Sequence, residues 1–135
     1  IAKELAPEEV EEYIKKYDIR LDEIEKVNKN LIHAKIGAYI CKNEYEFTED
    51  MFNAIKYHTT GRANMSTLEK IIYLADATEE TRQYDSEPYV KAIKQNIDKG
   101  IVEVCKWVII DLTEKNRIIH TNSIECYNYY IQKLN

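Results

Sequence analysis

Apolar residues recur at helical intervals of three and four along the whole chain. No segment shows the alternation of apolar and polar residues that is typical of a half-buried strand. Residues that break helices are rare, with 3 glycines and 2 prolines among 135 residues. The sequence therefore predicts an all-α fold, a helical bundle, and its length suits a single domain over residues 1–135.

Capping signals place the individual helices. Thr48 can cap one helix, and Ser66 with Glu69 forms a capping box for the next. Thr121 or Ser123 can cap the last helix. Helices are expected over residues 8–17, 31–44, 49–58, 67–78, 88–100, 101–116 and 124–134, with a short acidic turn at 21–27.

Composition excludes several classes of function. The most apolar stretch, residues 101–112, contains three charged residues and cannot span a bilayer. The net charge of −5 argues against broad nucleic-acid binding, although local cations or metal ions can hold a small anionic substrate. Three cysteines without a C-x-x-C pair predict neither a disulfide framework nor a zinc knuckle. We expect a cytoplasmic protein that binds neither membrane nor nucleic acid.

Three side chains that can bind a metal lie on predicted apolar helix faces. Asp76 follows Leu68 and Ile72 at four-residue spacing, so it is expected to point toward the core or its edge. His58 ends another apolar face, and His33 begins a third. An unpaired buried carboxylate costs several kcal/mol, so Asp76 should have a cation or strong donors nearby.

Each of these residues also has an ordinary structural interpretation. A histidine that faces inward is more often a hydrogen-bonded core residue than a metal ligand. Asp76 can pair with Arg82 or Lys70 instead of a metal. His120 is equally compatible with a residue that begins the last helix and with a ligand contact beside the helix N-terminus. Spacing alone leaves both interpretations open.

Four stretches of the chain closely resemble the YqeK family of bacterial His-Asp (HD) domain proteins, which are symmetrical bis(5'-nucleosyl)-tetraphosphatases. They are LIHAKIGAYI, YHTTGRANMSTLEKIIYLAD, the arginine six positions later, and IIHTNSIECYNYY. The resemblance covers nearly the whole chain and implies an all-α HD-domain helical bundle. It also implies a centre of two metal ions, iron in the first place and other divalent transition metals as alternatives.

The family's metal ligands are an early histidine, an adjacent His-Asp pair, two later histidines and a final aspartate. The last three match His33, His58 and Asp76, which the resemblance implies as metal ligands and catalytic residues. The early histidine and the His-Asp pair have no counterpart in this sequence, which therefore supplies half of the ligand set. We expect that an N-terminal portion carrying them precedes Ile1, the other interpretation being an inactive piece.

The four phosphates of the implied substrate need further cations and donors. Arg82 is the first candidate, because a planar guanidinium matches phosphate oxygens in pairs, and its alternative is a surface ion pair with Glu79 or Glu80. The full set of predicted substrate-binding residues is Arg82, His120, Thr121, Ser123, Arg62, Thr60, Gly61 and Lys3.

The leading hypothesis is a hydrolase in which a metal-activated water splits diadenosine tetraphosphate symmetrically into two ADP. The implied ligand is a dinucleoside polyphosphate or ADP, and a homodimer stays open. One alternative is an HD phosphohydrolase that acts on another nucleotide, such as a cyclic dinucleotide or a nucleoside triphosphate. Another is a non-catalytic helical interaction module.

Overall fold

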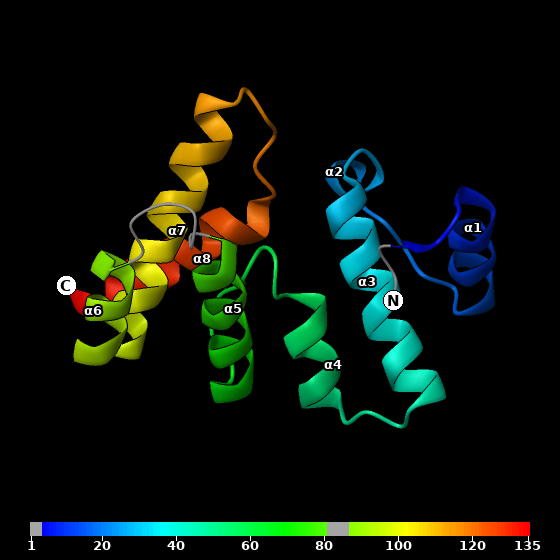
Figure 1. The fold of residues 1–135 in the computed structure, drawn as a ribbon, viewed down its shortest axis with the longest axis horizontal. Helices are drawn as coiled ribbons and strands as arrows, with labels where there is room; N and C mark the ends of the chain where they lie inside the picture. Colours follow the sequence, from blue (N-terminus) through cyan, green and yellow to red (C-terminus); the bar gives the residue numbers. More distant parts are fainter. Residues whose placement is uncertain (1–3, 81–86) are drawn as a thin grey trace.

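The computed structural model describes residues 4–80 and 87–135, and over these ranges it contains eight helices and no strand (Figure 1). The helices are α1 (Pro7–Lys16), α2 (Glu23–Lys26), α3 (Lys29–Glu44), α4 (Glu49–Lys56), α5 (Thr67–Glu80), α6 (Glu87–Gln95), α7 (Ile97–Glu114) and α8 (Thr121–Leu134). The all-α prediction is confirmed.

Two predicted caps are confirmed at the starts of α4 and α5. The side-chain oxygen of Thr48 accepts a hydrogen bond from the backbone N–H of Met51 at 3.2 Å. The N–H of Ser66 donates to Oε2 of Glu69 at 3.0 Å, and the N–H of Glu69 donates to Oγ of Ser66 at 3.2 Å. These bonds satisfy backbone donors that a helix start leaves without partners.

The predicted helix boundary at Gly100 is wrong. Helix α6 ends at Gln95, and Asn96 caps α7, so that Gly100 lies inside α7. A Cβ atom on Gly100 would lie 2.4 Å from Cγ1 of Ile93. The glycine therefore serves the close packing of α6 against α7 and does not end a helix.

The predicted caps of the last helix are also wrong. Helix α8 begins at Thr121, and its cap is His120, whose Nδ1 accepts the backbone N–H of Asn122 at 3.0 Å. Histidine is not among the residues that commonly cap helices, so the sequence pattern favoured its hydroxyl-bearing neighbours. Ser123 lies inside the helix and is buried.

The described residues form two hydrophobic clusters, and each cluster is the core of one part of the fold. The larger joins α5, α7 and α8, with Tyr73, Val104 and Tyr130 almost completely buried. The smaller lies beside α1 and α3 around Ile36 and Ile40. Helix α4 packs against both α3 and α5 and connects the two parts (Figure 1). The connection between α4 and α5, which carries His58, therefore passes from one part to the other.

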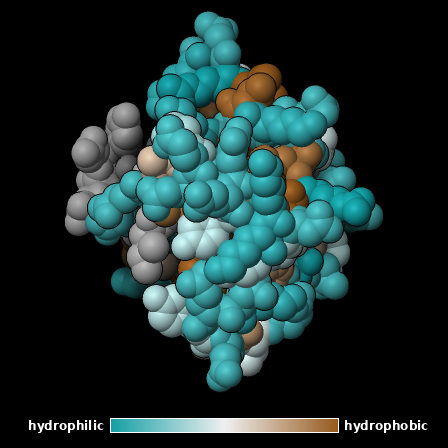
Figure 2. All heavy atoms as spheres, turned by 90° about the vertical axis from the view of Figure 1, so that its right-hand side faces the viewer, coloured by the Kyte–Doolittle hydropathy of each residue, from teal (hydrophilic) through white to brown (hydrophobic). Residues whose placement is uncertain are grey.

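The surface is largely hydrophilic on the side where α1 lies (Figure 2). The first turn of α1 is acidic and its last turn is basic, an order that suits the helix dipole. Within the described ranges, no helix combines the length and the apolar character that are needed to cross a membrane.

Candidate functional site

His58 lies half-buried in the turn that follows α4, and its ring orientation is fixed by the backbone. Nδ1 lies 2.5 Å from the carbonyl oxygen of Ile55, which can only accept, so Nδ1 carries the proton. The lone pair of the neutral ring is therefore on Nε2, whose neighbour is Oγ1 of Thr59 at 3.4 Å. Histidines that ligate metals typically donate their other ring N–H to a carbonyl or carboxylate in this way.

His33 on α3 and Asp76 on α5 are half-buried, and neither side chain makes a hydrogen bond or ion pair with another residue that the structure describes. Lys70, one predicted alternative partner of Asp76, pairs instead with Asp98 at 2.7 Å. A half-buried carboxylate without a protein partner is unfavourable, because it has lost part of its hydration. Among the residues that the structure describes, no cation pairs with Asp76, and Arg82, its other predicted partner, lies outside them.

The three predicted ligands do not form a closed site by themselves. Their ligand atoms do not all lie within 4.8 Å of one another, a condition that another group of described residues meets. The assignment of His33, His58 and Asp76 as metal ligands therefore remains a prediction.

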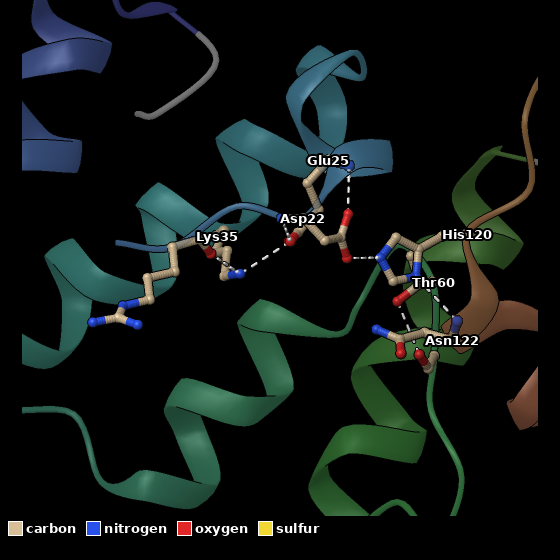
Figure 3. Close-up of polar contacts among 8 residues, drawn as sticks. Asp22, Glu25, Lys35, Thr60, His120 and Asn122 are labelled. Atoms are coloured by element: carbon tan, nitrogen blue, oxygen red, sulfur yellow. Dashed lines mark hydrogen bonds and ion pairs between the residues drawn. The ribbon is translucent and has the colours of Figure 1, made fainter. Parts of the chain in front are cut away.

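The group that does converge consists of Asp22, Glu25 and His120 (Figure 3). Asp22 caps α2 by accepting the N–H of Glu25 at 2.7 Å, and Oε1 of Glu25 accepts the N–H of Asp22 at 2.9 Å. Lys35 adds a cation, with Nζ 3.1 Å from Oε1 of Glu25. Since the three side chains already have partners and an ammonium group beside them, we interpret the group as a hydrogen-bond network.

The hydrogen bonds of His120 determine which ring nitrogen carries the proton. Nδ1 accepts from the N–H of Asn122, so the proton is on Nε2, which donates to Oδ2 of Asp22 at 2.7 Å. Burial raises the pKa of Asp22, but hydrogen bonds from the Glu25 backbone and from His120 bring it below its ordinary value. A sequence pattern could find the capping box at 22–25, but nothing in it points to a partner 98 positions away.

Arg62 makes close contacts within the protein that the sequence did not predict. Its Nε and Nη2 donate to the two carboxylate oxygens of Glu69 at 2.7 and 3.0 Å, and its guanidinium lies over the ring of Tyr57 at 4.4 Å. The side chain of Glu69 is only 3% exposed. Burial raises the pKa of Glu69, but the hydrogen bonds from Arg62 and Ser66 hold it below its ordinary value. Arg62 therefore holds a structural ion pair, and its predicted contact with substrate stays a prediction.

Thr60, Gly61 and Ser123 meet where the turn after α4 touches the start of α8. Oγ of the buried Ser123 donates to the carbonyl oxygen of Thr60 at 3.0 Å. Gly61 has a φ of +69°, and a Cβ atom there would lie 2.8 Å from Sγ of Cys126. Glycine is therefore required by the close approach to α8 as well as by the backbone angle.

Two cavities adjoin this junction. The larger, of about 580 Å³, lies between the start of α3, the end of α7 and the start of α8. Its walls include Leu31, Trp107, Leu112, Thr59 and Thr60. The smaller, of about 210 Å³, is lined by Lys35, Lys56, His120 and Thr121, among others. The predicted residues Lys3 and Arg82 lie outside the described residues.

Comparison with known proteins places these features in a family. Residues 1–81 match the model of the HD domain family. A symmetrical bis(5'-nucleosyl)-tetraphosphatase of Halalkalibacterium halodurans is 40% identical over 100 residues, 73% of this chain and 54% of the relative. One from Staphylococcus aureus is 35% identical over 104 residues, 74% of this chain and 54% of the relative. The chain thus spans about half the length of these relatives.

A solved structure gives the same result for the fold. A Clostridium acetobutylicum protein described as a predicted HD superfamily hydrolase involved in NAD metabolism matches with a TM-score of 0.87 at 34% identity. The match covers 98% of this chain and 71% of that protein. The family match extends over more than half of the residues, and the helical arrangement agrees with it. The chain belongs to the HD domain family.

Proposed function

We propose that this protein is a metal-dependent hydrolase that splits diadenosine tetraphosphate symmetrically into two ADP in the cytoplasm. The observation that carries the proposal is the orientation of His58, which places Nδ1 against the backbone carbonyl of Ile55 and directs Nε2 away from it. The names of the relatives from H. halodurans and S. aureus support the choice of substrate.

His33, His58 and Asp76 are the residues of this chain that would hold the ions. Imidazole and carboxylate donors suit iron, and also manganese or zinc. Bound ions at such centres make hydroxide available from water at neutral pH and offset the charge that builds on the attacked phosphate. The chain's own contribution is to fix the His58 ring through Ile55 and to keep Asp76 without a competing partner among the described residues.

The larger cavity supports a nucleotide as the substrate. Its volume of about 580 Å³ lies within the range of about 300–1,000 Å³ that is usual for small-molecule sites. Trp107 and Leu112 provide apolar wall for a base, and Arg117 provides a cation at the rim. Thr59 and Thr60, the two residues after His58, line the same cavity. One nucleoside end placed here would lie beside the turn that carries His58.

Product analysis tests the proposal. The protein expressed from its complete gene is loaded anaerobically with iron and incubated with diadenosine tetraphosphate, and the nucleotides are separated by chromatography. ADP as the sole product supports symmetrical cleavage, whereas AMP with ATP contradicts it. Parallel reactions with a cyclic dinucleotide and a nucleoside triphosphate test the other phosphohydrolase hypothesis. A protein that takes up no metal and cleaves none of these substrates contradicts the proposed function and favours an interaction module.

A further inference from the structure

His120 connects two parts of the fold that are distant in sequence (Figure 3). Its side chain is 7% exposed and uses both ring nitrogens. Nδ1 accepts the backbone N–H of Asn122 and so caps α8, while Nε2 donates to Asp22, the cap of α2, at 2.7 Å. One imidazole therefore fixes the start of α8 against the start of α2.

A second set of contacts leads from the start of α8 to the turn that carries His58. Ser123, in the first turn of α8, donates from Oγ to the carbonyl oxygen of Thr60 at 3.0 Å. Oγ1 of Thr60 donates to the carbonyl oxygen of Gly61 at 2.8 Å. The N–H of Gly61 donates to the carbonyl oxygen of Tyr57 at 2.8 Å and closes the turn around His58. Ser123 and Thr60 are both buried, so water competes little for these bonds.

We propose that His120 is a positioning residue, which acts through Asp22 and Ser123 to hold the His58 turn in the geometry that metal binding requires. This inference rests on the proposed function, because it assigns His58 to the metal. It differs from the substrate contact predicted for His120 and Ser123, since each side chain is already engaged within the protein. Removing a group that hydrogen-bonds directly to a ligating histidine typically changes metal affinity or activity by about 10- to 100-fold, and His120, which acts through further contacts, is expected at the lower end of this range.

The choice of histidine distinguishes positioning from simple capping. Asparagine, aspartate and serine cap helices well, and histidine is not among the preferred residues. Those shorter side chains offer nothing that reaches Asp22 while they cap α8. Histidine at position 120 is a weaker cap than these residues, but its Nε2 makes a second hydrogen bond, to Asp22. This bond links the start of α8 to the start of α2.

The protonation pattern makes Asp22→Asn an informative variant. One carboxylate oxygen of Asp22 accepts the N–H of Glu25, and the other accepts from Nε2 of His120. Asparagine has a single acceptor oxygen, so it can serve the cap of α2 or His120 but not both. The His120 ring cannot adapt by moving its proton, because Nδ1 must remain free to accept from Asn122.

The test uses the complete gene product with His120→Asn, Asp22→Asn and Ser123→Ala. His120→Asn keeps an acceptor for the N–H of Asn122 but loses the contact with Asp22. The matched control is Asn96→Ala, which removes the cap of α7. The side chain of Asn96 accepts hydrogen bonds from two backbone N–H groups at the start of that helix. Iron affinity, kcat and KM are measured for each variant, together with the hydrogen-exchange rate of the Gly61 N–H in the metal-free protein.

We expect the three variants to lose about tenfold or more in iron affinity or kcat, with little change in KM. Exchange of the Gly61 N–H should accelerate in them and remain at the wild-type rate in Asn96→Ala. Variants that match Asn96→Ala in both readouts would overturn the proposal. A wild-type protein that neither binds iron nor hydrolyses the substrate contradicts the proposed function instead, and the Gly61 exchange rate then decides the positioning role alone. Should His120→Asn not fold, Ser123→Ala gives the same readouts.

Discussion

The ion pair between Arg62 and Glu69 yields the sharpest prediction, because the sequence favoured a substrate contact and the structure shows a buried partner. In Arg62→Met the carboxylate of Glu69, 3% exposed, loses both guanidinium hydrogen bonds. Removing one partner of a buried pair costs about 3–5 kcal/mol. Arg62 is 32% exposed, and Ser66 still donates to Glu69, so we expect the lower end, about 3 kcal/mol.

Urea unfolding followed by circular dichroism measures this difference in the free energy of unfolding. The matched control is Lys26→Met, which breaks an ion pair whose side chains are 55% and 90% exposed. That control should change stability by less than about 1 kcal/mol. The double variant Arg62→Met with Glu69→Gln removes the buried charge and should recover part of the loss, since an uncompensated carboxylate is the main cost. A loss below about 1 kcal/mol in Arg62→Met, with a raised KM for the nucleotide, would refute the structural assignment.

The same pair predicts a dependence on pH. Glu69 has a folded-state pKa below its ordinary value of 4.5 in the wild type. Its contribution to stability is therefore fully present above pH 4.5 and is lost as the pH falls through the lower folded value. Without Arg62, burial would raise the pKa of Glu69, so protonation would stabilise the variant relative to neutral pH. The stability difference between wild type and Arg62→Met should shrink as the pH falls below about 5, and a constant difference would contradict this account.

Three further outcomes test the site. His58→Ala and Asp76→Ala should each abolish turnover and lower the metal content, which elemental analysis of the purified proteins measures. Arg82→Ala should weaken nucleotide binding or turnover while metal content stays normal, and a loss of metal would show that its assigned role is wrong. Gly61→Ala should destabilise the fold by about 2 kcal/mol or more in urea unfolding, because the left-handed angle costs about 1–2 kcal/mol for a side chain and the new Cβ atom would lie 2.8 Å from Sγ of Cys126.

Features that depend on neighbouring residues were predictable from the sequence. The caps at Thr48 and at Ser66 with Glu69 act within one helical turn, so their spacing identifies them. The helical class followed from periodicity, because an amphipathic helix repeats its apolar residues whatever it packs against. Gly100 shows the limit of this reasoning, because its role lies in the contact with Ile93 of the preceding helix and not in ending its own helix.

The sequence analysis did not predict the second contact of residues that serve two purposes. Glu69 completes a cap and also binds Arg62, and the first role gave no reason to expect the second. His120 caps α8 with one nitrogen and reaches Asp22 with the other. Such pairings arise only when the chain folds back on itself, so no local pattern records them.

The candidate metal ligands depend partly on local contacts and partly on contacts between distant segments. The orientation of the His58 ring is set by the carbonyl of Ile55, three residues earlier, so this orientation is a local property that helical spacing could indicate. The lack of a Lys70–Asp76 pair is not a local property, because Lys70 is held by Asp98 in another helix. A search for sequence patterns would therefore treat His58 and Asp76 alike as candidate metal ligands. In the structure, a local contact orients His58, whereas a contact between two helices keeps Lys70 away from Asp76. In the proposed metal centre, the His58 ring is oriented by its own turn. The Asp76 carboxylate does not pair with Lys70, because the packing of α5 and α7 places Lys70 beside Asp98.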